Sequence, residues 1–99
     1  MEMIRFEWDN FKNRINVAKH KVSFEEASTV FYDPNAIVFD DPSHSINEHR
    51  FLILGFSRKA HILIVSHCYR EDDQIIRIIS ARKATKTEIN FYNGREGTR

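Results

Sequence analysis

The chain has one cysteine, Cys68, among its 99 residues, so it cannot form an internal disulfide. Such cysteine usage is typical of a reducing compartment. No apolar run reaches the roughly 18 residues that span a bilayer. The N-terminal stretch MEMIRFEW carries charges at Glu2, Arg5 and Glu7, where a signal peptide would have an apolar core. We therefore expect a cytoplasmic protein without membrane contact.

Glycine and proline are scarce, with three and two residues. The chain has no Gly/Pro-rich linker, no internal repeat and no low-complexity tract. Its 41% hydrophobic content is enough for one compact core, and its length leaves no room for a second. We predict one domain over residues 1–94 and a disordered polar tail over residues 95–99.

Several catalytic signatures are also missing. There is no Gly-rich phosphate loop and no G-x-S-x-G motif, and Cys68 lies in no sequence pattern of a catalytic thiol. The five histidines lack a cysteine pair, an HExxH frame or a carboxylate at ligand spacing. We therefore predict no metal site and no cofactor, and expect Cys68 to fill apolar space in the sheet.

Lysine and arginine are absent from residues 22–49, which hold six acidic residues. All fifteen basic residues lie in 1–21 and 50–99, where eight acids leave a formal charge of +7. This segregation allows one basic surface for a polyanion and a separate acidic surface. Alternatively, the two sets mix in space and pair with each other.

The first helix is expected over residues 10–20, capped by Asp9. Its apolar stripe recurs at i, i+4 and i+7 and consists of Phe11, Ile15 and Ala18. Another face carries hydrogen-bond donors at helical spacing: Lys12, Asn16, Lys19 and His20. These residues suit either a common anionic ligand or an ordinary solvated surface.

The remaining elements follow from capping and β-propensity. Ser23 and Glu26 form a capping box for a helix over 24–32, and Thr85 with Glu88 forms another for a short helix ending at Gly94. Strands rich in β-branched residues are expected at 3–8, 36–40, 48–56, 61–68 and 74–81. The predicted fold is α+β in the order βααββββα, with helices packed on a mainly antiparallel sheet.

A register follows from the short loop SRKA. If Phe56 pairs with His61 across it, Arg50 lies opposite His67 on the same face of the sheet. The same reasoning for the next hairpin turns Arg77 toward the opposite face.

Cationic and proton-transferring side chains gather near the predicted strand ends. They are Lys12, His20, Arg50, His67, Arg70, Arg77, Arg82 and Tyr92. Metal-free RNA cleavage needs a base for the 2′-hydroxyl, positive charge for the phosphorane and an acid for the leaving oxygen, and these residue types supply all three. Each residue also has a structural explanation, so the residues alone leave a nuclease and a non-catalytic RNA-binding surface open.

Three segments resemble the BrnT family of small toxins: WDNFKNRINVAKHKVSFEEASTVFYDP, DDPSHSINEHRFLILGFS and RIISARKATKTEINFY. The match is most specific in KH-VSFEEA and RIISARKAT. Lys21 departs from the pattern, because the family often has glycine after the histidine. The resemblance implies a RelE-like ribonuclease, the toxin of a type II toxin–antitoxin pair. It would inhibit translation and be neutralised by a BrnA-type antitoxin whose ribbon-helix-helix part contacts operator DNA.

The resemblance implies a role for each of these cationic and proton-transferring residues. His67 is the first candidate for general acid or base, and Arg50 and Arg70 would balance the phosphorane charge. Arg77 and Arg82 would hold the scissile phosphate or the RNA backbone. The RNA surface would extend over Lys12, Lys19, His20 and Tyr92. The acidic residues 22–49 would stay away from RNA and help to hold the antitoxin. The alternative is a non-catalytic nucleic-acid-binding or partner-bridging module.

Overall fold

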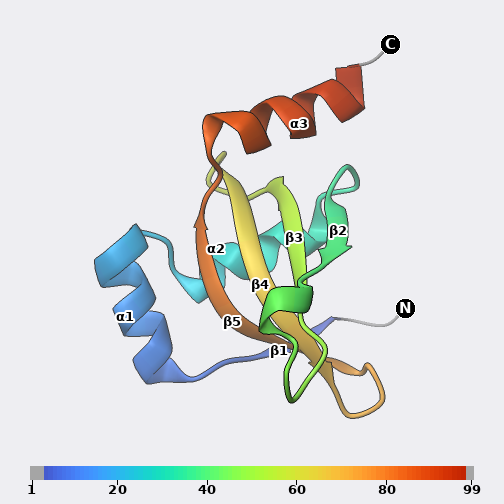
Figure 1. Ribbon diagram of the computed structural model, residues 1–99. Coiled ribbons are helices and arrows are strands. Elements are labelled where there is room, and N and C mark those ends of the chain that lie inside the picture. The colour runs from blue at the N-terminus through green and yellow to red at the C-terminus, as the bar shows by residue number, and fades with distance from the viewer. Residues whose placement is uncertain (1–3, 98–99) are drawn as a thin grey trace.

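The computed structural model describes residues 4–97 and contains a five-stranded sheet with helices on both faces (Figure 1). Its strands are β1 (Arg5–Glu7), β2 (Ile37–Asp40), β3 (Phe51–Phe56), β4 (Ile62–Arg70) and β5 (Ile75–Lys83). Its helices are α1 (Asn10–His20), α2 (Phe24–Thr29) and α3 (Lys86–Gly97), with short 3₁₀ turns η1 (Val30–Tyr32) and η2 (Pro42–His44). The predicted α+β class and mainly antiparallel sheet are confirmed.

The strand order in the sheet is β1-β5-β4-β3-β2. β2 to β5 are antiparallel neighbours, whereas β1 runs parallel to β5. Phe51 lies opposite His67, and Phe56 lies opposite Ile62. The register predicted from the SRKA loop is therefore wrong by one residue, and Arg50 does not face His67.

A bulge interrupts the pairing of β4 with β5. Ser66 pairs with Ser80 but His67 pairs with Ile78, so Ile79 has no opposite residue. An extra residue reverses the alternation of side chains along one strand. Arg77 pairs with Cys68, next to His67, and so projects from the face opposite His67, as the sequence predicted.

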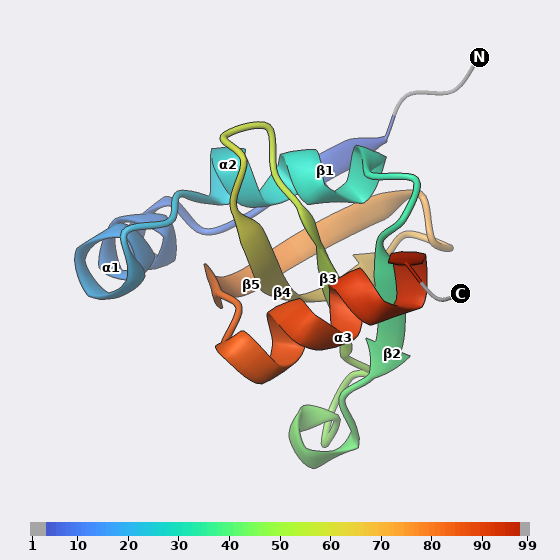
Figure 2. The same ribbon diagram turned by 90° about the horizontal axis from the view of Figure 1, so that it is seen from above.

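Two apolar layers cover the sheet unequally. The larger core lies on the side of α2 and joins Phe24, Ala27 and Val30 to sheet residues including Leu63 and Val65. The smaller core lies under α3 and consists of Leu54, Ile64 and Tyr92, with partly buried neighbours. Figure 2 shows α2 and α3 on opposite faces, with α3 and η2 on the same side. Because α3 crosses only one end of its face, the other end stays open.

α1 does not pack on the sheet through its apolar stripe. Its buried residue is Asn16, while the side chains of Phe11 and Ile15 are 61% and 49% exposed. Asn16 Nδ2 donates to the carbonyl oxygens of Val22 and Ala81, both at 2.8 Å, and its Oδ1 accepts from the amide of Ala81 at 3.2 Å. Beyond the end of β1, Asn16 therefore takes the hydrogen-bonding place of a neighbouring strand beside β5. The prediction that Asn16 offers a donor to a bound ligand is wrong.

Local capping positions the other helices. Ser23 Oγ accepts from the amide of Glu26, but the Glu26 carboxylate accepts from Ser57 instead of closing the capping box. Thr85 and Glu88 form both hydrogen bonds of their capping box. α3 continues to Gly97, past its predicted end at Gly94. The predicted disordered tail thus begins within a helix, and its last residues, 98–99, lie outside the described residues.

Candidate functional site

The open end of the α3 face contains a groove of about 290 Å³. Leu52, Ile64 and Ser66 line it from β3 and β4, and Ser80 lines it from β5. Its polar rim consists of His20, Asp41, His44, Arg50 and Arg82. Two imidazoles and two guanidinium groups therefore share one hollow, drawn from α1, η2, the residue just before β3, and β5.

His44 belongs to η2, which holds it beside an aspartate. His44 Nδ1 lies 3.1 Å and 3.2 Å from the two carboxylate oxygens of Asp41. The side chain of His44 is 66% exposed and that of Asp41 is 12% exposed. A carboxylate that accepts from Nδ1–H fixes the tautomer and leaves Nε2 for proton transfer. The pair has the arrangement of an oriented general base.

Short bonds across the loop hold η2 against the sheet. The Asp41 amide donates to the Arg50 carbonyl at 3.0 Å, and the Arg50 amide donates to Ser45 Oγ at 2.9 Å. Ser45 Oγ in turn donates to the Asp41 carbonyl at 2.7 Å. These bonds fix His44 relative to Arg50, whose Nε donates to Glu48 at 3.3 Å.

Arg82 enters the groove from β5 and is held from α3. Its Nη1 and Nη2 each donate to Glu88 at 2.9 Å, and Nη1 also donates to the Lys83 carbonyl. The Arg82 hydrogen bonds lower the pKa of Glu88 to about 2. A guanidinium has five N–H donors. These bonds leave the Nε–H and one Nη2–H of Arg82 for a phosphate oxygen.

His20 is the last residue of α1, and Asn16 one turn earlier anchors that helix to β5. The following residue, Lys21, has a φ of 62° and ends the helix in the left-handed region. That conformation favours glycine, and here a lysine adopts it. The sharp turn makes His20 the end of the helix, where it reaches the groove.

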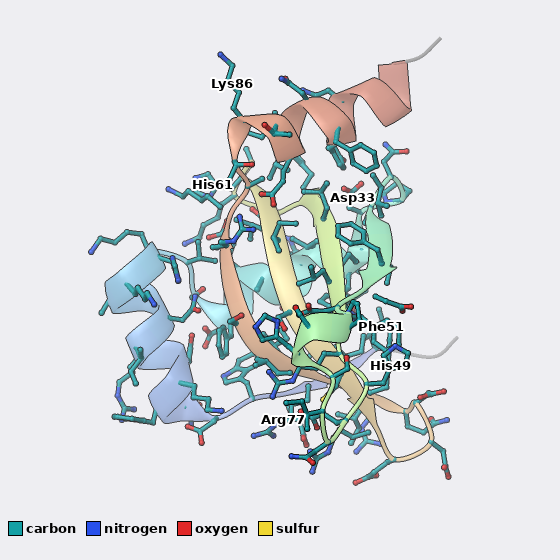
Figure 3. All side chains as sticks on the ribbon, in the orientation of Figure 1. Asp33, His49, Phe51, His61, Arg77 and Lys86 are labelled. Atoms are coloured by element: carbon teal, nitrogen blue, oxygen red, sulfur yellow. The ribbon has the colours of Figure 1, made fainter. Side chains whose placement is uncertain are left out.

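Arg70 and Arg77 lie farther along the same face, near the end of the sheet away from His61 and Lys86 (Figure 3). Arg77 Nη1 donates to Glu7 at 2.8 Å, and Arg70 Nε lies 3.7 Å from the same carboxylate oxygen. The Glu7 carboxylate therefore holds both guanidinium groups at this end of the face.

His67 is not at the surface, which corrects the prediction that it acts on a substrate. Its side chain is fully buried between Phe31, whose ring centroid lies 4.8 Å away, and Phe51 at 5.9 Å. Nδ1 contacts the Val65 carbonyl, and Nε2 has no hydrogen-bond partner among residues 4–97. Burial lowers the pKa of His67. His67 is a neutral core residue.

Tyr92 is also buried and is not available to stack on a base. Its ring packs with Leu54 and Ile64, and its hydroxyl donates to Asp33 at 2.6 Å. Lys12 and Lys19 are exposed on α1 and do not line the groove. Of the predicted site residues, the groove brings together His20, Arg50 and Arg82.

Two groove residues, Asp41 and His44, are not among those predicted from the sequence. Their signal is the segment DDPSH, where an aspartate precedes a histidine by three residues across a proline-initiated turn. It belongs to the acidic region 22–49, and the structure places this part of it in the same groove as Arg50 and Arg82.

Residues 4–97 contain no group of three or more His, Cys, Asp or Glu side chains that could hold a metal ion. Within the same part of the chain, no helix has the length and hydrophobicity needed to cross a membrane.

Comparison with known proteins decides the family. The family model for the ribonuclease toxin BrnT of type II toxin–antitoxin systems matches residues 8–88. This chain belongs to the BrnT family. Its fold is similar to the crystal structure of the Brucella abortus ribonuclease toxin BrnT, with a TM-score of 0.65 and 22% identity over 85% of this chain and 100% of that chain. No curated protein sequence matches. As a BrnT-family member of a type II system, the chain has an antitoxin as its expected partner.

Proposed function

We propose that this BrnT-family chain is a metal-independent endoribonuclease that cleaves RNA in the groove at the open end of the α3 face. The observation that carries the proposal is the pairing of two imidazoles, His20 and His44, with two guanidinium groups, Arg50 and Arg82, along one hollow. Family membership supports ribonuclease activity.

The reaction follows from the chemistry of these groups. His44 Nε2 takes the proton from a ribose 2′-hydroxyl, and the 2′-oxygen attacks the adjacent phosphorus. The bond from phosphorus to the 5′-oxygen breaks, and His20 protonates that oxygen. The products are a 2′,3′-cyclic phosphate and a 5′-hydroxyl. Arg50 and Arg82 stabilise the extra negative charge of the phosphorane.

The remaining predicted residues have supporting roles. Arg70 and Arg77 lie on the same face and would bind the RNA backbone beyond the groove, and Lys12 and Lys19 would extend binding over α1. His67 and Tyr92 act only through packing. Ser66 and Ser80 on the groove floor offer hydroxyls to the ribose.

The biological setting is proposed from the family. The toxin would act in the cytoplasm, where RNA cleavage would inhibit translation. Its antitoxin would be of the BrnA type, with a ribbon-helix-helix part that alone contacts operator DNA. The fold class and the catalytic inventory are compatible with a relationship to RelE-type ribonucleases.

The direct test compares His44→Ala with wild type on a short RNA. Loss of a general base costs about 10²–10⁴-fold in rate, and the exposed position of His44 predicts little change in stability. Lys86→Ala is a control, because Lys86 is exposed and does not line the groove. A 2′-deoxy nucleotide at the cut should block cleavage completely. Cleavage by His44→Ala at the wild-type rate would overturn the assignment.

A cellular test addresses the toxin role. Expression of wild type alone should arrest growth and amino-acid incorporation, and co-expression of the antitoxin encoded next to it should restore both. His44→Ala at the same soluble level should not arrest growth. Unaffected growth with wild-type protein clearly present would contradict the proposal.

A further inference from the structure

The apolar stripe of α1 faces outward, because the helix packs on the sheet through its other side. Asn16 is the buried residue of α1 and bonds to β5, whereas the stripe residues Phe11, Ile15 and Ala18 are all exposed. Figures 1 and 2 both show α1 at one margin of the molecule, beyond the sheet. The orientation of an ordinary amphipathic helix, with its apolar side toward the core, is therefore reversed here.

The stripe is large enough to pack against another helix. Phe11 and Ile15 are four residues apart and Ala18 follows three residues later, so the three side chains are neighbours on the helix surface. Together they extend about 10 Å along the helix axis, which is two turns. Single exposed apolar residues are ordinary, but a contiguous row of them marks an interaction site. Rows at this spacing are the ridges through which helices pack together.

Basic side chains flank the stripe on both sides. Lys12 and Lys19 lie three residues before and four residues after Ile15, and both are exposed. On the other side, the guanidinium carbon of Arg14 lies 5.7 Å from the centroid of the Phe11 ring. The helix contains no acidic residue. The outer surface of α1 therefore has an apolar centre and a positive rim.

Charge complementarity selects the occupant of this surface. A second copy of the chain would bring its own cations against these, and like charges oppose association. RNA would use the cations, but the aliphatic side chains of Ile15 and Ala18 are not rings on which a base stacks. An acidic amphipathic helix matches both the centre and the rim. Membership of a toxin–antitoxin family supplies a protein partner, the antitoxin.

We propose that an acidic amphipathic helix of the antitoxin packs on the stripe Phe11, Ile15 and Ala18 and pairs with Lys12 and Lys19. This inference rests on the proposed ribonuclease function, in which the same two lysines bind RNA. Antitoxin and RNA therefore compete for α1. The antitoxin neutralises the toxin by displacing its substrate from this helix.

The first experiment measures antitoxin affinity by calorimetry. The antitoxin encoded next to the chain is titrated into the full-length His44→Ala protein, in which cleavage is removed. Phe11→Ala combined with Ile15→Ala should weaken binding about 30-fold, the loss typical of an interface hot spot. Val38→Ala removes an exposed apolar side chain from β2 and is the matched control, with unchanged affinity expected. The melting temperature of each variant should stay near that of His44→Ala, because the substituted side chains are exposed.

A second pair of variants tests the rim. Lys12→Glu combined with Lys19→Glu should slow antitoxin association about 10-fold at low salt and reduce its salt dependence. Lys59→Glu, exposed in the loop between β3 and β4, is the charge control and should change neither. Asp40→Lys probes the acidic region 22–49, which the sequence suggested for the antitoxin. Weaker binding by Asp40→Lys, with unchanged binding by both α1 double variants, would overturn the proposal.

Other occupants of α1 have their own readouts. A basic amphipathic helix also suits an anionic membrane surface, so the His44→Ala protein is mixed with phosphatidylserine vesicles, and its self-association is followed by sedimentation. The proposal expects neither binding to vesicles nor a dimer. Vesicle binding or dimerisation that Phe11→Ala with Ile15→Ala removes, with antitoxin affinity unchanged, would overturn it.

Cleavage assays separate this proposal from the function on which it rests. The antitoxin should raise the KM of the active chain for RNA and leave kcat unchanged, because it competes with the substrate; a lower kcat at unchanged KM would overturn the competition. Phe11→Ala with Ile15→Ala should cleave at the wild-type rate and need about 30-fold more antitoxin for half inhibition.

The two failures have different signatures. Normal inhibition of the Phe11→Ala, Ile15→Ala variant would reject the α1 site and keep the ribonuclease. Antitoxin binding that depends on the stripe, in a chain that cleaves no RNA, would reject the ribonuclease function and keep the docking site.

Discussion

Asn16→Ala is expected to weaken the protein far more than an ordinary helix substitution. The Asn16 amide makes three hydrogen bonds, to Val22 and to both backbone groups of Ala81, and its side chain is buried. Alanine would leave two carbonyls and one amide without these partners. A buried group left unsatisfied costs about 1–3 kcal/mol. Because a shortened side chain admits some water, we expect a total loss of about 2–4 kcal/mol.

The loss is a large fraction of the roughly 5–15 kcal/mol that stabilises a typical domain. Urea unfolding should measure it directly, and the melting temperature should fall by roughly 10–30 °C. Cleavage per folded molecule should also fall, since Asn16 holds the end of α1 that carries His20. Asn10→Ala, exposed in the same helix, is the control and should change stability by less than about 0.5 kcal/mol. A loss below about 1 kcal/mol for Asn16→Ala, or normal specific activity in the folded fraction, would refute this reasoning.

Three further predictions concern charge and metal. RNA cleavage should persist in excess EDTA; loss of activity that zinc or magnesium restores, with the fold intact, would contradict metal independence. Replacing both Lys12 and Lys19 with alanine should reduce the slope of the logarithm of RNA affinity against the logarithm of salt concentration by about 0.7 per lost phosphate contact. An unchanged slope would show that both residues are solvated and do not contact RNA. The hydrogen bonds from Arg82 hold the pKa of Glu88 at about 2, below its ordinary 4.5. The ionised Glu88 therefore stabilises the folded state fully above pH 4.5, and this contribution disappears as pH falls toward 2. Glu88→Gln should remove about 1 kcal/mol of this pH-dependent stability after allowance for solvent screening, as acid titration of unfolding would measure; an identical pH profile would argue against the bond.

The site itself was only partly readable from the sequence. Three groove residues could be predicted because their residue types suit a phosphodiester: His20, Arg50 and Arg82. His67 has the same chemistry but lies in the core, and Tyr92 is held by Asp33, 59 residues away. Residue type reports what a side chain can do, whereas exposure depends on the face that tertiary packing covers.

Features fixed by neighbouring residues were determined by the sequence alone. Asp9 starts α1 and Thr85 with Glu88 starts α3, because capping bonds join residues two or three positions apart. The β3–β4–β5 meander followed from short loops between apolar strands. Only tertiary structure decided the register, the bulge after Ser66, and which side of α1 is buried. Asn16 shows the reason: its partner Ala81 is 65 residues away, and bonds over that distance outweigh the helix's own apolar stripe.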